Sequence, residues 1–506
     1  MTIRNILSRM LVCLMAVAAF PVVAEHLVII AANDTHSQID PTADNLSGVL
    51  RRRAIYDHIR SQNPNTVTVH AGDAVQGTVY FTLYKGEVEY ALLDSLGYDM
   101  VILGNHEFDN GLESLAEHYK NVKATKLSVN YDMSGTPLEG MFTPYTIKRY
   151  GDRRVAFFGI NVEPAGLISL ANYQGITYAP SLEVADAMAQ FLKEKLKVDY
   201  AVMISHIGYT SYDPGETNDV DIIKASRYID LVVGGHSHTV VKPGSEMATV
   251  NNADGRPITV GQNGKSGKYV ATYDLDLETG QVVYNQISVD STWDNAASRY
   301  TELSQWLQPY RNGVDSLMNN PLCISTQMKD NASPAMQNWI SDVVMAIVPK
   351  LSGVNNIDLA ILNKGGIRVD MPEGTVTEGV MMSMFPFDNR FVVLEMTGKQ
   401  LLDALKVMAG RDGDAISKEL KVTYNSKGDI TSAKVKGKKV DPKKTYKVAT
   451  IDYLANGGDY MTPFIETKRL FVDGQKYGNH VINYLKQLNA QGKKIEFTDE
   501  VRMKKK

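Results

Sequence analysis

Residues 101–111 read VILGNHEFDNG, an apolar run that ends abruptly in polar side chains. Val101, Ile102 and Leu103 suit a buried strand, and Gly104 suits a sharp turn. The next five residues carry an amide, an imidazole and two carboxylates, all of which can bind a metal ion or move a proton. We therefore predict a buried strand whose C-terminal end delivers functional side chains.

The alternation of short apolar runs with helical patterns extends from residue 26 to about residue 290. The apolar runs are HLVIIAAND, TVTVHAGD, RRVAFFGI, DYAVMISH and DLVVGGHSH, and helical patterns such as GVLRRRAIYDHIRSQ lie between them. Strands that alternate with helices indicate an α/β domain. In such a sheet the C-terminal ends of parallel strands share one edge, so groups far apart in sequence meet there.

Metal-capable side chains directly follow the predicted strands. They are Asp34, His36, Asp73, Asn105, His206, His236 and His238, with His106 beside them. Each alone has an ordinary explanation, such as a helix cap or a hydrogen-bonded histidine, but their shared position predicts a metal site. Aspartate, asparagine and histidine without a thiolate suit Zn, Mn, Co or Fe. Because seven groups exceed one tetrahedral zinc, we expect two divalent metal ions, an arrangement that recurs in phosphoryl hydrolysis.

A second domain is predicted after a helical connector. Residues 291–330 contain STWDNAASRYTELSQWLQPYRNGVDSLMNN, an amphipathic pattern that separates a first domain of residues 25–290 from a second of residues 331–506. The second domain begins with SPAMQNWISDVVMAIVPKL, in which Ser333 can cap a helix and Pro334 suits its first turn. Runs such as IDLAIL and RFVVLEM follow, so strands are expected there too.

The overall charge limits the possible partners. With 53 basic and 57 acidic side chains the formal net charge is −4, which gives no positive field for holding a nucleic acid polymer. A small phosphorylated ligand stays compatible, because a local group of cations can bind it. The sequence leaves the oligomeric state open between a monomer and a weak dimer.

Residues 1–24 have the features of a signal peptide. Arg4 and Arg9 precede the apolar stretch MLVCLMAVAAF, and PVVA ends in small residues before Glu25. A membrane anchor needs about 20 apolar residues, which is longer than this run, and no later run suits a membrane span. Once the signal is removed, Cys323 is the remaining cysteine, so no intramolecular disulfide is expected. These features favour a secreted protein, most simply in a bacterial periplasm.

Eight sequence blocks together resemble one enzyme family. NDTHSQ, HAGDAVQGT, LGNHEFDNG, SHIGY and GGHSHT resemble the signature blocks of calcineurin-like metallophosphoesterases. NKGGIR, FPFDNRFVVLEMTG and DYLANGGDYMTPF extend the resemblance to the 5'-nucleotidase / UDP-sugar hydrolase family, and all eight occur in the family's order. The resemblance implies a four-layer αββα metallophosphoesterase sandwich, followed by a 5'-nucleotidase C-terminal substrate-binding domain of α/β (α+β) type.

The resemblance also divides the metal-capable residues between two ions. It assigns the first ion to Asp34, His36 and His238, the bridge to Asp73, and the second ion to Asn105, His206 and His236. Related nucleotidases often carry Gln or Asn at the position of His238. Because an imidazole binds divalent ions more strongly than an amide oxygen does, we expect tighter binding at that site. Gln262 matches another family position, for which a metal-site role and a structural hydrogen-bonding role are equally open.

His106 is expected to contact the substrate rather than a metal ion. Asp109, three residues later, can accept a hydrogen bond from the imidazole and favour its protonated form. The resemblance implies the same His-Asp dyad. We expect metal-activated water to attack phosphorus while His106 stabilises or protonates the leaving oxygen, so His106 should affect turnover more than binding.

The second domain is expected to supply specificity. Arg368 follows two glycines in NKGGIR and presents a fork suited to phosphate, and Arg390 in FPFDNRF is a weaker candidate of the same kind. The resemblance places Tyr453 against a nucleobase and Asp459 on the ribose hydroxyls. The family usually adds a second aromatic residue after the helix TGKQLLDALKVMAG, but RDGDAISKELKVTY lacks Phe. Base recognition should therefore be weaker here.

Together these features predict a secreted phosphohydrolase that releases phosphate from nucleoside 5'-monophosphates, with nucleotide diphosphate sugars as further candidate substrates. Because Arg368 and the metal-capable residues lie in different predicted domains, a shared substrate requires domain closure. The alternative enzyme is a 2',3'-cyclic nucleotide phosphodiesterase or a broad phosphoesterase. The non-enzyme alternative is a nucleotide-binding or adhesion module on an inactive scaffold, which predicts a missing ligand or dyad residue, and none is missing from the sequence.

Overall fold

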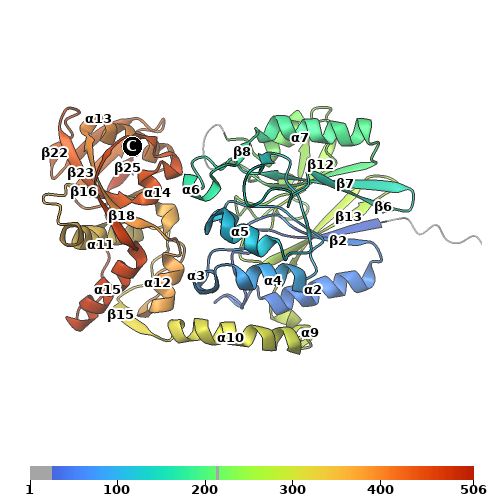
Figure 1. The fold of residues 1–506 in the computed structure, drawn as a ribbon, viewed down its shortest axis with the longest axis horizontal. Coiled ribbons are helices and arrows are strands. Elements are labelled where there is room, and N and C mark those ends of the chain that lie inside the picture. The colour runs from blue at the N-terminus through green and yellow to red at the C-terminus, as the bar shows by residue number, and fades with distance from the viewer. Residues whose placement is uncertain (1–25, 212–215) are drawn as a thin grey trace, which may run out of the picture.

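The computed structural model describes residues 26–211 and 216–506 as two domains joined by a long helix, α10 (Thr301–Met318) (Figure 1). The predicted signal peptide, residues 1–24, lies outside the described residues. Within those two ranges, no helix is both long and apolar enough to cross a membrane.

Two six-stranded sheets form the centre of the N-terminal domain. The strand order of the first sheet is β14 (Val282–Ser288), β13 (Tyr269–Asp276), β1 (His26–Ala32), β2 (Thr66–His70), β3 (Met100–Val101) and β4 (Thr125–Lys126). That of the second is β11 (Thr249–Asn251), β12 (Pro257–Gly261), β10 (Leu231–Val233), β9 (Tyr200–His206), β7 (Arg153–Asn161) and β6 (Tyr145–Tyr150). Strands β1 to β4 pair in parallel, as do β7, β9, β10 and β12, so their C-terminal ends share one edge in each sheet.

The two sheets pack face to face between two layers of helices. Leu27 and Ile29 of β1 lie in one core with Phe157 of β7, whereas Val28 and Ile30 lie in another core with helices. This division follows from the alternation of side chains along a strand. Helices α2 (Val49–Gln62), α4 (Glu87–Ser95) and α5 (Gly111–Tyr119) cover the first sheet, and α7 (Ser181–Gln190) and α8 (Asp219–Ala225) cover the second. The αββα sandwich implied by the resemblance is confirmed.

Shorter elements complete this domain. The strand predicted at residues 101–103 is shorter than expected, because β3 ends at Val101 and the buried Ile102 and Leu103 lead into the turn without pairing in the sheet. Other short elements include α3 (Val79–Tyr84), α6 (Leu170–Tyr173), the antiparallel pair of β5 (Tyr131–Asp132) and β8 (Thr177–Tyr178), and a π-helical turn at Phe191–Lys195.

The connector leads into the C-terminal domain along one side of the molecule. Helix α10, preceded by α9 (Asp294–Ala297), lies between β14 and β15 (Pro321–Ser325), inside the connector predicted at residues 291–330. The limits of the three segments predicted from the sequence remain a proposal. Ser333 caps α11 (Pro334–Ser352) by accepting a hydrogen bond from the N–H of Met336, as predicted.

The C-terminal domain combines two larger sheets with helices. Its five-stranded sheet has the order β19 (Ala415–Ile416), β16 (Leu359–Leu362), β23 (Thr445–Ile451), β18 (Arg390–Thr397) and β24 (Lys468–Lys476). A four-stranded sheet contains β22 (Lys438–Lys439), β21 (Ile430–Val435), β20 (Leu420–Tyr424) and β25 (Met503–Lys505), and β15 pairs with β17 (Gly374–Thr377). The helices are α11, α12 (Glu378–Met384), α13 (Gly398–Gly410), α14 (Asp452–Ala455) and α15 (Tyr477–Ala490).

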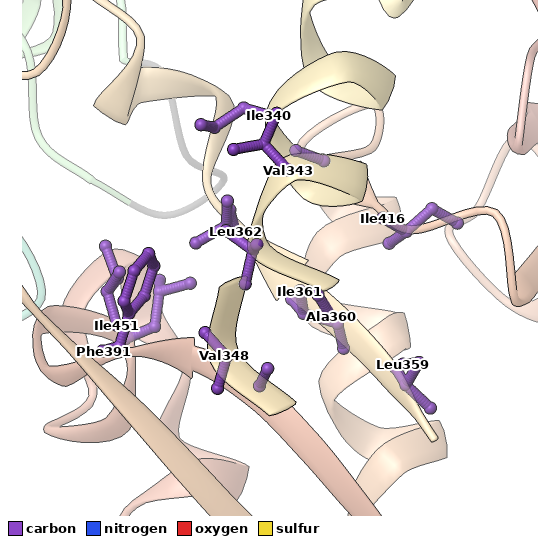
Figure 2. Close-up of a cluster of buried hydrophobic side chains, with 14 of the residues drawn as sticks. Ile340, Val343, Val348, Leu359, Ala360, Ile361, Leu362, Phe391, Ile416 and Ile451 are labelled. Atoms are coloured by element: carbon purple, nitrogen blue, oxygen red, sulfur yellow. The ribbon is translucent and has the colours of Figure 1, made fainter. Parts of the chain in front are cut away.

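Strand β16 lies in the middle of this domain's core. All four of its residues are buried, which is typical of a central strand covered on both faces. Figure 2 shows its Leu362 beside Ile340 and Val343 of α11, with Ile451 of β23 and Phe391 of β18 nearby. A rigid strand therefore leads into the loop that carries Arg368.

Candidate metal and substrate site

Five strand ends deliver the predicted ligands to one place. Asp34 and His36 follow β1, Asp73 follows β2, Asn105 follows β3, and His236 and His238 follow β10. His206 is the last residue of β9. The ligand atoms lie within 4.8 Å of one another in three groups: Asp34, His36 and His238; His36, Asp73 and His106; and Asp73, His206 and His236. Because His36 and Asp73 each belong to two groups, the three groups form one continuous cluster, which we call the metal edge. Asn105 joins it through a 2.9 Å contact between its Oδ1 and His236 Nδ1.

The backbone of the metal edge adopts a conformation that side chains usually avoid. Asp34, His36, Asp73, His236 and His238 all have positive φ angles, between 47° and 84°. Left-handed backbone at residues other than glycine is uncommon and clusters at functional sites. Gly104, in the stretch VILGNHEFDNG, lies in the same crowded region, where a Cβ atom would collide with the carboxylate of Asp73. These turns aim the polar side chains inward rather than toward solvent.

Backbone carbonyls orient two of the imidazoles. His206 Nδ1 lies 2.7 Å from the carbonyl oxygen of Ala71, and His36 Nδ1 lies 3.1 Å from that of Gln76. A carbonyl oxygen can only accept, so each Nδ1 carries a proton and each Nε2 faces the cluster. His36 Nε2 is 2.9 Å from His238 Nε2, and the buried His206 Nε2 lies 3.2 Å from Asp73 Oδ2.

This donor set fits divalent cations. Imidazole nitrogens and carboxylate oxygens gathered this closely need positive charge among them, from protons or from metal ions. Nitrogen and oxygen donors without a thiolate suit the borderline ions expected from the sequence. Burial lowers the pKa of His206, but Asp73 and Asp34 outweigh burial and raise it to about 10. The carboxylates therefore favour positive charge at this place, whether a proton or a metal ion supplies it.

Glu107 holds the turns of the metal edge in place through hydrogen bonds from their backbone. Its carboxylate accepts hydrogen bonds from the backbone N–H groups of Asp73, Ala74 and Gly104, at 3.0, 2.8 and 2.6 Å. Burial, followed by the charge of Asp73, raises the pKa of Glu107 to about 7. Glu107 therefore fixes two of the ligand-bearing turns to each other, a positional role.

His106 and Asp109 form a hydrogen-bonded pair at the rim of the metal edge. His106 Nδ1 lies 2.9 Å from Asp109 Oδ2, and the backbone N–H of His106 donates to Asp73 Oδ1 at 2.9 Å. Burial lowers the pKa of His106, but the carboxylates of Asp109 and Asp73 outweigh burial and raise it above its ordinary value. The imidazole is thus held in place and favours its protonated form.

Gln262 has a structural role in this arrangement. Its Oε1 accepts hydrogen bonds from the N–H of Thr239 at 2.6 Å and the hydroxyl of Ser237 at 2.9 Å. Its Nε2 donates to the carbonyl oxygen of Gly235 at 2.6 Å. Gln262 therefore holds the turn that carries His236 and His238.

Of the two arginines predicted for phosphate, the structure brings Arg368 to the metal edge. Arg368 Nη2 donates to Gln76 Oε1 of the N-terminal domain at 3.2 Å. Arg390 begins β18 with an exposed side chain, and its backbone N–H donates to Asp452 Oδ1 at 3.0 Å. Among the described residues, no polar contact joins the guanidinium of Arg390 to the metal edge.

Tyr453 and Asp459 lie together in a second group, which we define as Asn363, Arg411, Asp414, Tyr453 and Asp459. We call it the nucleoside pocket after the ligand that the family resemblance predicts for it. The Tyr453 hydroxyl donates to Asp459 Oδ1 at 2.8 Å, and Asn363 Nδ2 donates to Asp459 Oδ2 at 2.9 Å. Arg411 donates to the carbonyl oxygen of Asp459 at 2.6 Å and pairs with Asp414.

Sequence reasoning missed Arg411 and the contacts between the domains. Arg411 follows α13 directly, in the segment where a second aromatic residue was sought, so the place was known but not the residue type. The N–H of Asp459 donates to the carbonyl oxygen of Gly166 at 2.7 Å, and the Tyr453 hydroxyl lies 3.2 Å from the same oxygen. The nucleoside pocket therefore touches the N-terminal domain.

Comparison with protein-family models identifies both domains. Residues 27–240 match the calcineurin-like phosphoesterase family, and residues 318–466 match the 5'-nucleotidase C-terminal domain. Together the two matches cover more than half of the chain, in the same order as the structural domains.

Relatives and solved structures agree with these matches. The chain is 28% identical to human 5'-nucleotidase, covering 86% of this chain and 84% of that protein. It is 26% identical to the trifunctional nucleotide phosphoesterase YfkN of Bacillus subtilis, covering 94% of this chain but 35% of that longer protein. The crystal structure of a 5'-nucleotidase precursor from Thermus thermophilus superposes with a TM-score of 0.81, at 26% identity, over 95% of this chain and 99% of that one.

Proposed function

Because the chain belongs to the calcineurin-like metallophosphoesterases with a 5'-nucleotidase C-terminal domain, and so is a metal-dependent phosphoesterase, we propose that it releases phosphate from nucleoside 5'-monophosphates. The observation that carries this proposal is the His106–Asp109 pair, whose atoms lie 2.9 Å apart beside the metal edge. Metal ligands and an oriented proton donor in one place suit hydrolysis of a phosphate ester.

The metal edge is proposed to hold two divalent ions drawn from Zn, Mn, Co or Fe. The first site comprises Asp34, His36 and His238, the second comprises Asn105, His206 and His236, and Asp73 lies between them. When bound, such ions supply positive charge that activates water and neutralises phosphoryl oxygens. His238 supplies an imidazole where an amide would bind more weakly, so the first site is expected to bind its ion tightly.

The protein's own side chains are proposed to handle the proton and the substrate. Asp109 holds His106 Nδ1, which leaves Nε2 to present a proton to the oxygen of the leaving nucleoside. Arg368 presents its guanidinium to the phosphate. Tyr453 and Asp459 are proposed to take the nucleobase and the ribose hydroxyls. Because these residues come from both domains, the substrate binds between them.

Phosphate release from AMP tests the proposal. The purified chain without residues 1–24 is first treated with a chelator and then supplied with Mn, Co or Zn, alongside His106→Ala. Turnover that returns with metal and collapses in the variant is expected. Binding of about two ions without turnover of any nucleotide ester would contradict the proposal and favour a nucleotide-binding module.

A broader substrate range is the second candidate. The relative named a trifunctional nucleotide phosphoesterase supports activity on more than one kind of nucleotide ester. We propose 2',3'-cyclic nucleotides and nucleotide diphosphate sugars as the further substrates. Product analysis with cyclic and linear nucleotides and with UDP-glucose separates these activities. We also propose export through residues 1–24, which fractionation of expressing cells checks.

A further inference from the structure

Lys265 lies beside the metal edge, in the loop between β12 and β13, and its side chain is exposed. Among the residues that the structure describes, this side chain makes no hydrogen bond and no ion pair. Lys268, three positions later in the same loop, pairs instead with Asp44 at 2.7 Å. The loop therefore carries one lysine whose charge is neutralised by a neighbour and one whose charge is available to a ligand.

Backbone hydrogen bonds fix this loop to two turns of the metal edge. On one side of Lys265, the N–H of Ser266 donates to the carbonyl oxygen of Asp34 at 2.7 Å. On the other side, the N–H of Gly264 donates at 2.9 Å to the carbonyl oxygen of Thr239, which directly follows the ligands of β10. The backbone of Lys265 is thus held between the two turns that carry the ligands of the first metal site.

A second cation approaches the same place from the other domain. Arg368 Nη2 donates to Gln76 Oε1 at 3.2 Å, which brings the guanidinium to the metal edge. The surrounding protein partly buries the amine of Lys265, and this burial, followed by the charge of Arg368, lowers the pKa of Lys265 below its ordinary 10.5. Two cations in electrostatic range repel each other, and an anion between them removes that repulsion.

The carboxylates near Lys265 are already occupied. Asp34 and Asp370 oppose the effect of Arg368 on the amine, but Asp34 is a proposed metal ligand. Asp370 accepts a hydrogen bond from the N–H of Asn331 at 2.8 Å. Many exposed lysines are simply solvated, whereas this one lies beside ligand-bearing turns and a proposed phosphate ligand. The position suits a small anion of high charge, which is the nature of a phosphoryl group.

We propose that Lys265 is a phosphate-binding residue that contacts one oxygen of the phosphoryl group opposite Arg368, so that each domain contributes a cation to the substrate. An ammonium is a point charge suited to a single oxygen, whereas a guanidinium forms a fork. The inference rests on the proposed function and adds a phosphate contact from the N-terminal domain. Because inorganic phosphate carries the same oxygens, Lys265 binds this product as well.

Inhibition by the two products of AMP hydrolysis tests the inference. In the metal-loaded enzyme, Lys265→Ala should raise KM for AMP and the inhibition constant of inorganic phosphate by the same factor, about 3- to 10-fold, with little change in kcat. The inhibition constant of adenosine, which carries no phosphate, should stay the same. Lys265→Arg keeps the charge and should recover most of the loss. The factor should shrink as salt increases, because salt screens an exposed charge.

Lys268→Ala is the matched control, because it removes a lysine of the same loop whose charge is paired with Asp44. It should leave KM and both inhibition constants unchanged. An unchanged KM in Lys265→Ala, an equal rise for adenosine, or an equal loss in Lys268→Ala would overturn the inference.

Calorimetry with inorganic phosphate separates this inference from the proposed function. The metal-loaded parent should bind phosphate more tightly than Lys265→Ala does, by the same factor of about 3 to 10. If the parent shows this difference but hydrolyses no nucleotide, the proposed function fails and the phosphate contact stands. Equal phosphate affinities in the two proteins would overturn the phosphate contact, whatever the activity.

Discussion

The metal edge and the nucleoside pocket are built in opposite ways. Residues of the metal edge follow strands, and Asp34, Asp73 and His206 have at most 1% of their surface exposed. Residues of the nucleoside pocket lie on loops and short helical turns, and Tyr453 and Asp459 are partly exposed. In the metal edge, ligand atoms lie within 4.8 Å of one another in three groups. In the nucleoside pocket, the polar side chains mainly form hydrogen bonds with one another.

This difference suits the metal edge to catalysis and the nucleoside pocket to substrate specificity. Groups held on strand ends, with backbone and neighbouring side chains fixing each one, are arranged before any substrate arrives. Groups that bind one another must exchange those partners for a substrate, so the affinity they give depends on small energy differences. We therefore expect substitutions at the metal edge to have large effects and those in the nucleoside pocket to have smaller, substrate-dependent effects.

The largest effect is expected for His106→Ala. Loss of the proton donor should lower kcat for AMP by about 100- to 10,000-fold, while KM changes little. Burial lowers the pKa of His106, but Asp109 and Asp73 outweigh burial and raise it above its ordinary value. The acid form should therefore persist to higher pH, and this part of the activity should be lost as pH rises through the raised pKa. Rates of phosphate release from about pH 5 to about pH 10 check both points.

Asp109→Asn is the companion variant. It keeps the shape of the dyad but removes the charge that favours protonated His106, so the loss of activity should begin at lower pH than in the parent enzyme. A pH profile that is unchanged in Asp109→Asn would show that His106 does not act as an acid.

The next effect concerns stability. Glu89 of α4 is 4% exposed and faces a small cavity, lined also by Thr35, Ser37 and Arg52, with about 20 Å³ of space for the centre of a water molecule. Burial raises its pKa from the ordinary 4.5 to about 7. Its stabilising contribution is thus present below pH 4.5 and lost as pH rises through about 7. Glu89→Gln should be more stable than the parent at about pH 8, by on the order of 3 kcal/mol, and equal to it at about pH 4.

Denaturant unfolding of the metal-free chain at several pH values measures this difference. Glu87→Gln is the matched control, because it removes the same charge from an exposed position on the same helix. A stability difference for Glu89→Gln that does not vary with pH would contradict the prediction.

The variant Arg368→Ala should affect substrate binding. Loss of a charged hydrogen bond costs about 1.5–3 kcal/mol, so kcat/KM for AMP should fall by roughly 10- to 100-fold, mainly through KM. Arg390→Ala is the control, since its exposed guanidinium has no polar contact with the metal edge among the described residues. Equal losses in the two variants would show that both arginines bind phosphate.

The metal edge was predictable from the sequence because strand order along the chain determines which side chains share an edge. Asp73 and His206 are 133 positions apart, yet each directly follows or ends an apolar run, and parallel pairing brings the ends together. The division of that domain into two sheets came from the family resemblance, since alternation alone predicts an α/β fold without counting sheets. The early end of β3 was missed, because apolar residues entering a turn look like strand.

The nucleoside pocket was predictable in place but not in detail. Tyr453 and Asp459 were named from one motif, and the structure brings them together. Their contacts with Arg411 and Gly166 depend on how loops and domains pack, and no local pattern encodes that packing. The ring of Phe387 in the C-terminal domain stacks 6.0 Å from that of His106, and no local pattern predicts this contact because its partners come from different domains.

The smallest effect is expected for Tyr453→Phe. The Tyr453 hydroxyl donates to Asp459 Oδ1 at 2.8 Å and so occupies an oxygen that ribose hydroxyls are proposed to use. Removing the hydroxyl frees that acceptor without changing the ring, so KM for AMP should fall by roughly 2- to 10-fold, the value of about one hydrogen bond. KM for p-nitrophenyl phosphate, which has no ribose, should stay the same. Tyr460→Phe removes a neighbouring hydroxyl that binds Glu216 instead, and it should not change the ratio of the two KM values. A higher KM for AMP in Tyr453→Phe would mean that the hydroxyl supports the bound nucleoside, and the pocket would then be as pre-arranged as the metal edge.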